Sequence, residues 1–297
     1  MSVNPSQILI YTAVSAAPIA WLLSKAVPRV FLEKCNLGRT NFEGKQVPTA
    51  CGVVLLTAII PTLACTVASY PHRPEAVSFA FAAPAFALLG LVDDIWGDRS
   101  AGGFKGHLKS LLAGKITTGI IKALFGGAVA VGCGFALAFR QDVLASKQGL
   151  IERQSLFLDS IEAVLAAALI ALCANGLNLL DTRPSRAGSI YVLFSVILLV
   201  WSREPPAVAV SSALLLAVVA YLPAERRREC MMGDTGANML GAVLGLHAAL
   251  ILEMWPKAVA LAALVWLHLY SENHSLSAAI EGRPLLNRLD KALRGEK

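Results

Sequence analysis

Charged residues are scarce in this chain of 297 residues, and their scarcity excludes most soluble folds. Only 15% of the residues are Asp, Glu, Lys or Arg, whereas 56% are hydrophobic, and the mean hydropathy is +0.62. A soluble domain of this length carries charge over its surface and confines its apolar residues to a core. The composition therefore predicts an integral membrane protein.

Paired cysteines, repeats and polar domains are also absent. The six cysteines stand far apart and form no Cys-x-x-Cys pair, which argues against a disulfide framework or a metal site of cysteines. We expect them to be small packing residues. Since no repeat, low-complexity tract or extramembrane domain is apparent, the chain is predicted to form one polytopic membrane domain over 1–275 and a cytoplasmic tail over 276–297.

What the chain does contain is a series of long apolar runs. With about 20 residues per crossing, it has room for about nine transmembrane helices and thus an all-α fold. The predicted spans are 7–24, 50–69, 76–96, 115–138, 156–178, 187–201, 206–222, 235–252 and 257–271. The sixth and seventh are short, and a re-entrant hairpin is an alternative for that pair. In the tail, leucines alternate with basic residues over 283–294, which is typical of an amphipathic helix on the inner leaflet.

The distribution of basic residues predicts the orientation. No Lys or Arg precedes the first span, whereas five follow it before the second. Threading the chain from an outside N-terminus leaves only six of the 26 Lys and Arg residues in outer loops. This positive-inside bias predicts a cytoplasmic C-terminus. Small residues within the spans permit close helix contacts, either inside the bundle or across a homodimer interface.

Three short polar motifs adjoin the spans. They are Gly-Leu-Val-Asp-Asp at 90–94, Asn-Gly-Leu-Asn-Leu-Leu-Asp at 175–181 and Gly-Asp-Thr-Gly at 233–236. Acidic residues next to membrane spans are costly and are therefore functional candidates. The predicted topology places all three motifs, together with Lys45, on the cytoplasmic face.

Oxygen ligands on one membrane face favour a hard cation. Carboxylate and amide oxygens without a histidine–cysteine pattern suit Mg²⁺ or Mn²⁺, which commonly completes its coordination with water and substrate phosphates. Basic residues on the same face could hold phosphorylated partners. They are Lys45, Arg99, Lys105, Lys109, Lys115, Arg183, Arg186 and residues 226–228. His107, between Lys105 and Lys109, could contact a lipid phosphate or could be a neutral packing residue.

Structural roles are the alternative for the motif residues. Asp93 and Asp94 could cap the third span, although two acids at a helix C-terminus oppose the helix dipole. Asp234 could be an N-cap, which is compatible with metal binding. Asn175 and Asn178 could only bond neighbouring helices, and Lys45 could only determine topology.

Four motifs in order resemble one enzyme superfamily. The patterns Lys-x-x-Pro-Thr-x-x-Gly from Lys45, Gly-Leu-Val-Asp-Asp, Asn-x-x-Asn-x-x-Asp and Met-Gly-Asp-x-Gly are similar to those of the polyprenyl-phosphate N-acetylhexosamine-1-phosphate transferases. These are bacterial plasma-membrane enzymes that start lipid-linked intermediates of peptidoglycan, teichoic acid and O-antigen. The resemblance implies transfer of a sugar-1-phosphate from a UDP-sugar to undecaprenyl phosphate, with release of UMP and with Mg²⁺ as cofactor.

The resemblance also implies roles for individual residues. The expected metal ligands are Asp234, then Asn175 and Asp94, and the expected catalytic residues are Asp93, Asp94 and Asp181. Asp93 would lie near the lipid phosphate as a base or a positioning group. The implied substrate contacts are Lys45, Asn178, Lys105, His107, Arg186 and His274.

Two departures from the superfamily pattern leave other functions open. The usual Asp-Gly-x-Asp-Gly continuation is replaced by Asp181-Thr-Arg-Pro-Ser-Arg-Ala187, and a histidine cluster in the last cytoplasmic loop is reduced to His274. An alternative is therefore a non-catalytic relative that binds polyprenyl phosphate or a partner in envelope assembly. A transporter is a third hypothesis, which the lack of repeat symmetry disfavours.

Overall fold

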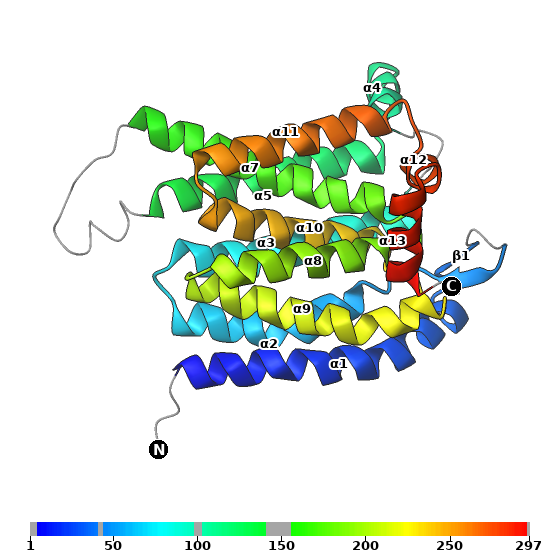
Figure 1. Ribbon diagram of the computed structural model, residues 1–297, viewed down its shortest axis with the longest axis horizontal. Coiled ribbons are helices and arrows are strands. Elements are labelled where there is room, and N and C mark those ends of the chain that lie inside the picture. Colours follow the sequence, from blue (N-terminus) through cyan, green and yellow to red (C-terminus); the bar gives the residue numbers. More distant parts are fainter. Residues whose placement is uncertain (1–4, 41–43, 98–102, 141–155, 296–297) are drawn as a thin grey trace.

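The computed structural model describes residues 5–40, 44–97, 103–140 and 156–295, which form a bundle of long helices (Figure 1). Within these residues, nine helices of 16 to 29 residues run along the bundle. They are α1 (Pro5–Glu33), α2 (Val53–Ser69), α3 (Pro74–Trp96), α5 (Thr118–Ala138), α7 (Leu156–Leu180), α8 (Arg186–Trp201), α9 (Pro205–Arg226), α10 (Gly233–Ile251) and α11 (Met254–Ser271). The shorter elements are α4 (Gly103–Leu112), α12 (Leu276–Glu281), α13 (Pro284–Arg294) and the antiparallel strands β1 (Gly38–Thr40) and β2 (Gln46–Pro48).

The helices agree with the hydropathy pattern, so the all-α prediction is confirmed. Five of them, in the described part of the chain, are long and apolar enough to cross a membrane, namely α1, α3, α5, α7 and α9, while α2 and α8 are shorter apolar helices. Because α9 has 22 residues, it can cross a bilayer by itself, which favours two crossings over a re-entrant hairpin at α8 and α9. The total of nine crossings stays a prediction.

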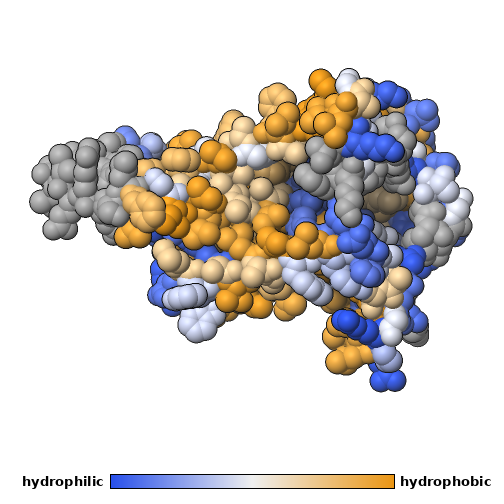
Figure 2. Space-filling model, turned by 90° about the horizontal axis from the view of Figure 1, so that it is seen from above, coloured by the Kyte–Doolittle hydropathy of each residue, from blue (hydrophilic) through white to orange (hydrophobic). Residues whose placement is uncertain are grey.

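Helix α10 lies at the centre of the bundle, against α3 and α7 (Figure 1). Nearly all of its residues are buried, and a Cβ atom on Gly241 would lie 2.2 Å from the carbonyl oxygen of Cys173 on α7. Such small residues let helix backbones approach closely. On the face seen in Figure 2, apolar side chains cover much of the length of the bundle, and hydrophilic ones gather toward the end that carries the polar motifs. This surface suits a protein surrounded by lipid.

Arginine and glutamate side chains pair at the opposite end of the bundle. Arg73, before α3, lies 3.1 Å from Glu204 at the start of α9. Arg140, after α5, lies 3.7 Å from Glu75 and 3.9 Å from Glu204. Two guanidinium groups thus face two carboxylates and connect the ends of three helices.

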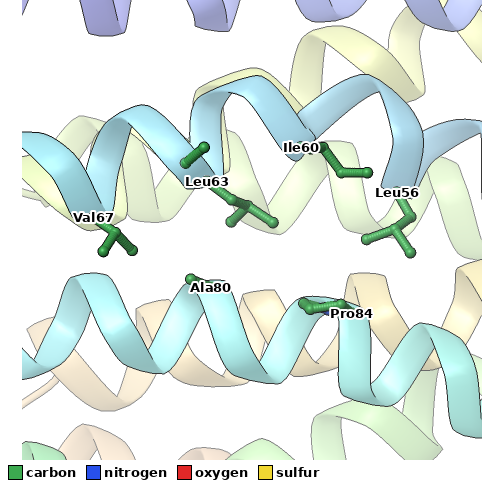
Figure 3. Close-up of a pocket in the computed structure, with 7 residues that line it drawn as sticks. Leu56, Ile60, Leu63, Val67, Ala80 and Pro84 are labelled. Atoms are coloured by element: carbon green, nitrogen blue, oxygen red, sulfur yellow. The ribbon is translucent and has the colours of Figure 1, made fainter.

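An apolar cavity of about 430 Å³ separates parts of α2 and α3 (Figure 3). Leu56, Leu63 and Val67 from α2 face Ala80 and Pro84 from α3. No residue of the three polar motifs lines this cavity. The candidate site is therefore elsewhere.

The six cysteines are free thiols in the described residues. Cys51, Cys133, Cys173 and Cys230 are buried, which confirms their prediction as packing residues. Cys35 is exposed, so the prediction is wrong there, because α1 continues to Glu33 and Cys35 lies in the turn that follows.

Candidate active site

Two aspartates from different motifs share one lysine. The Nζ atom of Lys122 on α5 lies 3.1 Å from Oδ2 of Asp93 at the end of α3, and 2.5 Å from Oδ2 of Asp234 at the start of α10. The Nδ2 group of Asn178 on α7 donates to the same Asp234 oxygen at 3.1 Å. The structure therefore brings Asp93, Asn178 and Asp234 together at one end of the bundle. All these side chains are partly exposed, so ligands can reach them.

Asp94 lies beside this cluster and caps α10. Its two carboxylate oxygens accept hydrogen bonds from the backbone N–H groups of Asp234 at 3.2 Å and Thr235 at 2.9 Å, and from the Thr235 hydroxyl at 2.7 Å. The Thr49 hydroxyl donates from the other side at 3.5 Å. A carboxylate at a helix N-terminus is stabilised by the free N–H groups and the dipole. The observed role is thus a cap on a neighbouring helix, and the predicted metal and catalytic roles of Asp94 stay predictions.

Glycines permit this cap. A Cβ atom on Gly90 would lie 2.1 Å from the carbonyl oxygen of Asp234, and one on Gly233 would lie 2.5 Å from Asp94. Gly233 also has a φ of +69°, which favours glycine over residues with a side chain. The glycines of two motifs therefore allow α3 and the start of α10 to touch through their backbones.

The end of β2 and the residues that follow it pair with the segment before α10. Met231 N–H donates to Pro48 O at 2.8 Å, and Gly52 N–H donates to Met232 O at 2.9 Å. A Cβ atom on Gly52 would lie 2.2 Å from the backbone nitrogen of Gly236. The first and last sequence motifs thus form one packed unit, although about 180 residues separate them, as expected for a site assembled from several motifs.

Glu225 and Asp181 lie beside this unit. The buried Glu225 accepts hydrogen bonds from Ser185 N–H at 3.1 Å and Met232 N–H at 2.9 Å, so it joins the loop after α7 to the start of α10. Part of Asp181 reaches the surface. Desolvation of its carboxyl group, together with the nearby carboxylates of Glu225, Asp234 and Asp94, nevertheless raises the pKa of Asp181. Asp181 is therefore held close to the cluster and tends to keep its proton.

Arg186 pairs with the C-terminal helix. It is buried and forms a two-pronged ion pair with Asp290 of α13, and the substrate contact that the resemblance implies for it stays a prediction. Within the altered segment 181–187, Ser185 has a φ of +63° and directly precedes Arg186 at the start of α8.

The remaining predicted residues lie around the cluster or outside the described side chains. Asn175, Lys45 and His274 are exposed, and the His274 ring stacks on Tyr270 with centroids 4.6 Å apart. Lys105 and His107 belong to α4, but their side chains lie outside the described residues. The predicted roles of these five residues stay predictions.

Two basic residues at the site were missing from the sequence-based set of site residues. Lys122 lies within a span, and an intramembrane charge could have been taken as a functional candidate for that reason alone. Arg39, on β1, donates to the backbone oxygens of Asp93 at 3.3 Å and Asp94 at 2.7 Å. Two acids at the C-terminus of α3 oppose the helix dipole, and the Arg39 cation at the same end offsets this unfavourable interaction.

The cluster fits a hard cation better than a soft one. In the described residues, no three or more His, Cys, Asp or Glu side chains are grouped so that they could hold a metal ion by themselves. Mg²⁺ commonly needs only one or two protein carboxylates, because water and substrate phosphates complete its shell. Asp93 and Asp234 already hold one cationic group, the Lys122 ammonium, between them.

A comparison with known protein families identifies a match. The family model described as glycosyl transferase family 4 matches residues 76–252, which is more than half of the chain and includes Asp93, Lys122, Asn178 and Asp234. No curated protein matches the chain.

Proposed function

The chain belongs to glycosyl transferase family 4, the family of polyprenyl-phosphate hexosamine-1-phosphate transferases, and from this membership we propose its reaction. The proposed reaction moves a sugar-1-phosphate from a UDP-sugar to undecaprenyl phosphate, or to another polyprenyl phosphate, and releases UMP. The product would start a lipid-linked glycan of the bacterial envelope. We place the site on the cytoplasmic face of the plasma membrane, where the positive-inside bias puts the motifs.

The observation that carries this proposal is the cluster of Asp93, Lys122, Asn178 and Asp234. It joins four helices at one end of an apolar bundle, so a water-soluble donor and a membrane lipid can both reach it. One ammonium is shared by two carboxylates, which leaves the group acidic. Such a group attracts a cation, and the cation in turn attracts phosphates.

Asp93 and Asp234 would hold Mg²⁺, with the Asn178 amide beside them. When bound, Mg²⁺ neutralises the charge on a diphosphate and thereby makes transfer easier. Lys122 would then be displaced from the carboxylates and would be free to bind phosphate oxygens. In this proposal Asp94 acts indirectly, because it fixes the start of α10 and hence the position of Asp234.

The acceptor needs little activation. A lipid phosphate monoester has its second pKa near 6, so much of it is a dianion at neutral pH. One of its oxygens would attack the sugar-bearing phosphorus of the donor, and the bond to the UMP oxygen would break as the new diphosphate bond forms. Asp93 would then position the acceptor and need not remove a proton.

The test is UMP release by the purified full chain in detergent. The assay contains undecaprenyl phosphate, Mg²⁺ and a panel of UDP-sugars, each with and without lipid. Lipid-dependent UMP from one donor would support the proposal and identify the sugar. Absence of UMP from every donor, in protein that still binds the lipid phosphate, would instead favour the non-catalytic relative, which the diversion of Arg186 to Asp290 also favours.

A further inference from the structure

The C-terminal helix α13 contacts the bundle through polar side chains and leaves its leucines outside. Asp290 and Arg294 are 6% and 7% exposed, whereas Leu285 and Leu289 are 72% and 54% exposed. A helix that only covers a protein surface usually turns its apolar side inward. Within the described residues, the leucine side of α13, formed by Leu285, Leu286, Leu289 and Leu293, is therefore available for another contact.

The polar side of α13 is clamped to the segment that follows α7. Arg186 donates from Nε to Asp290 Oδ1 at 2.6 Å and from Nη2 to Asp290 Oδ2 at 2.9 Å. Its third nitrogen donates to the hydroxyl groups of Thr182 at 2.7 Å and Ser277 at 3.0 Å. Buried two-pronged pairs of this kind are geometrically specific. The clamp therefore ties residues 182–186 to both α12 and α13.

The clamped segment also belongs to the candidate site. Asp181 precedes it, and Ser185 N–H donates to Glu225, which in turn accepts from Met232 N–H before α10. The segment is thus held between Glu225 on one side and Asp290 on the other. Movement of α13 would release one of these two attachments.

The position of α13 suits a lipid surface. In Figure 1, α13 lies across the end of the bundle, at a steep angle to the long helices. If the long helices cross a bilayer, α13 therefore lies near the membrane plane. Its exposed Arg288 lies beside the leucines. Leucines on one side and a basic residue beside them favour binding at the surface of an anionic leaflet.

We propose that α13 is a lipid-surface anchor that holds the 181–186 segment of the candidate site through the Arg186–Asp290 clamp. The leucines enter the boundary between headgroups and acyl chains, and the clamp transmits this fixed position to the segment. The importance of the segment for catalysis rests on the proposed function. The lipid contact and the clamp can be measured whether or not the proposed function is correct.

The first test measures lipid contact by photo-crosslinking. The full chain is placed in nanodiscs of phosphatidylethanolamine and phosphatidylglycerol, with p-benzoylphenylalanine in place of Leu289 or, as a control on the other side of the helix, Lys291. We expect severalfold more phospholipid adduct from position 289. Equal yields at both positions, or a crosslink from 289 to a second copy of the chain, would overturn the anchor.

The second test measures deuterium exchange in a peptide that covers 181–186, in the same nanodiscs. The variants are Asp290→Asn, the double change Leu285→Ser with Leu289→Ser, and the matched control Ala292→Ser. We expect severalfold faster exchange in the first two variants, because local opening accelerates exchange. The control should exchange at the rate of the unaltered chain. If the leucine variant exchanged like the unaltered chain, α13 would be a structural cap only. If contact and clamp were found but no donor gave UMP, the proposed function would fail and the anchor would stand.

Discussion

The two ends of the bundle both carry clustered charges, but only one cluster is balanced. At the end opposite the motifs, Arg73 and Arg140 face Glu75 and Glu204, so that each charge has a counterpart. At the motif end, Asp93 and Asp234 share the ammonium of Lys122. A balanced cluster can serve as a structural link, whereas an acidic cluster that ligands can reach favours a further cation.

The largest difference between the two ends should appear in activity. Asp234→Asn and Asp93→Asn each remove one of the two carboxylates that would hold the cation, so we expect UMP release to fall about 10³-fold. The matched change at the other end is Glu204→Gln, which should leave the rate unchanged. Similar losses from Glu204→Gln and Asp234→Asn would show that the clusters do not differ in function.

Backbone contacts should also distinguish the motif end. Gly90→Ala would place a Cβ atom against the backbone of Asp234, and we expect it to destabilise the chain by about 1–3 kcal/mol through overpacking. Gly132→Ala is the control, because a Cβ atom there meets nothing within 4 Å. Thermal unfolding in detergent measures both. Equal melting temperatures for the two variants would show that the contact at Gly90 is not tight.

Removal of the shared ammonium should change Mg²⁺ binding and kcat in opposite senses. Lys122→Met keeps the length of the side chain but leaves Asp93 and Asp234 without their cation. We expect Mg²⁺ to bind more tightly and kcat to fall about tenfold, or about 1.4 kcal/mol, since a phosphate contact is lost. Steady-state kinetics at several Mg²⁺ concentrations measure both effects. Weaker Mg²⁺ binding in this variant would contradict the account of Lys122 as a competitor for the carboxylates.

Two aspartates near the motif end should respond to pH in opposite directions. Because the pKa of Asp181 is raised by burial and neighbouring carboxylates, ionisation of this group destabilises the fold. Asp181→Asn should raise the melting temperature, with a gain that grows as the pH rises above the usual range for Asp and disappears below it. Burial opposes ionisation of Asp290, but hydrogen bonds from Arg186 and the charges of Arg186 and Arg294 hold its pKa below the usual value.

Asp290→Asn should therefore lower the melting temperature. This decrease in melting temperature has its full size above the ordinary pKa of Asp. It becomes smaller as the pH falls through the lowered pKa of Asp290 in the folded chain. Melting curves from pH 3 to pH 8, on a scale of a few degrees, test both aspartates. The same pH trend in both variants would rule out the opposite environments described for them.

The smallest effect is expected at the balanced end. The Arg73–Glu204 pair is partly exposed, and pairs of this kind contribute less than about 1 kcal/mol. Glu204→Gln should therefore lower the melting temperature only slightly, and high salt should reduce the difference further. A large loss of stability would indicate that this cluster holds α3, α5 and α9 together.

The sequence predicts the helices well because hydropathy and length decide where an apolar helix can lie. The range 76–96, for example, becomes α3 over Pro74–Trp96. The meeting of Asp93, Asn178 and Asp234 also follows from counting spans. Rotation of each helix about its axis does not follow from the sequence.

For that reason the sequence places Lys122 within a span but does not predict that its ammonium lies at the centre of the cluster. Asp94 and Arg186 show the same limit. Asp94 is one residue from Asp93 but turns toward the N–H groups of α10, and Arg186 turns toward Asp290. These directions depend on tertiary contacts with residues far away in the chain.

The central feature of the proposed site is a cation held between Asp93 and Asp234. Mn²⁺ titration followed by electron paramagnetic resonance, on the full chain in nanodiscs, can compare the unaltered protein with Asp234→Asn and Glu204→Gln. We predict that Asp234→Asn weakens Mn²⁺ binding about tenfold or more, whereas Glu204→Gln leaves it unchanged. Equal Mn²⁺ binding by all three proteins would contradict the claim that the acidic cluster is the cation site.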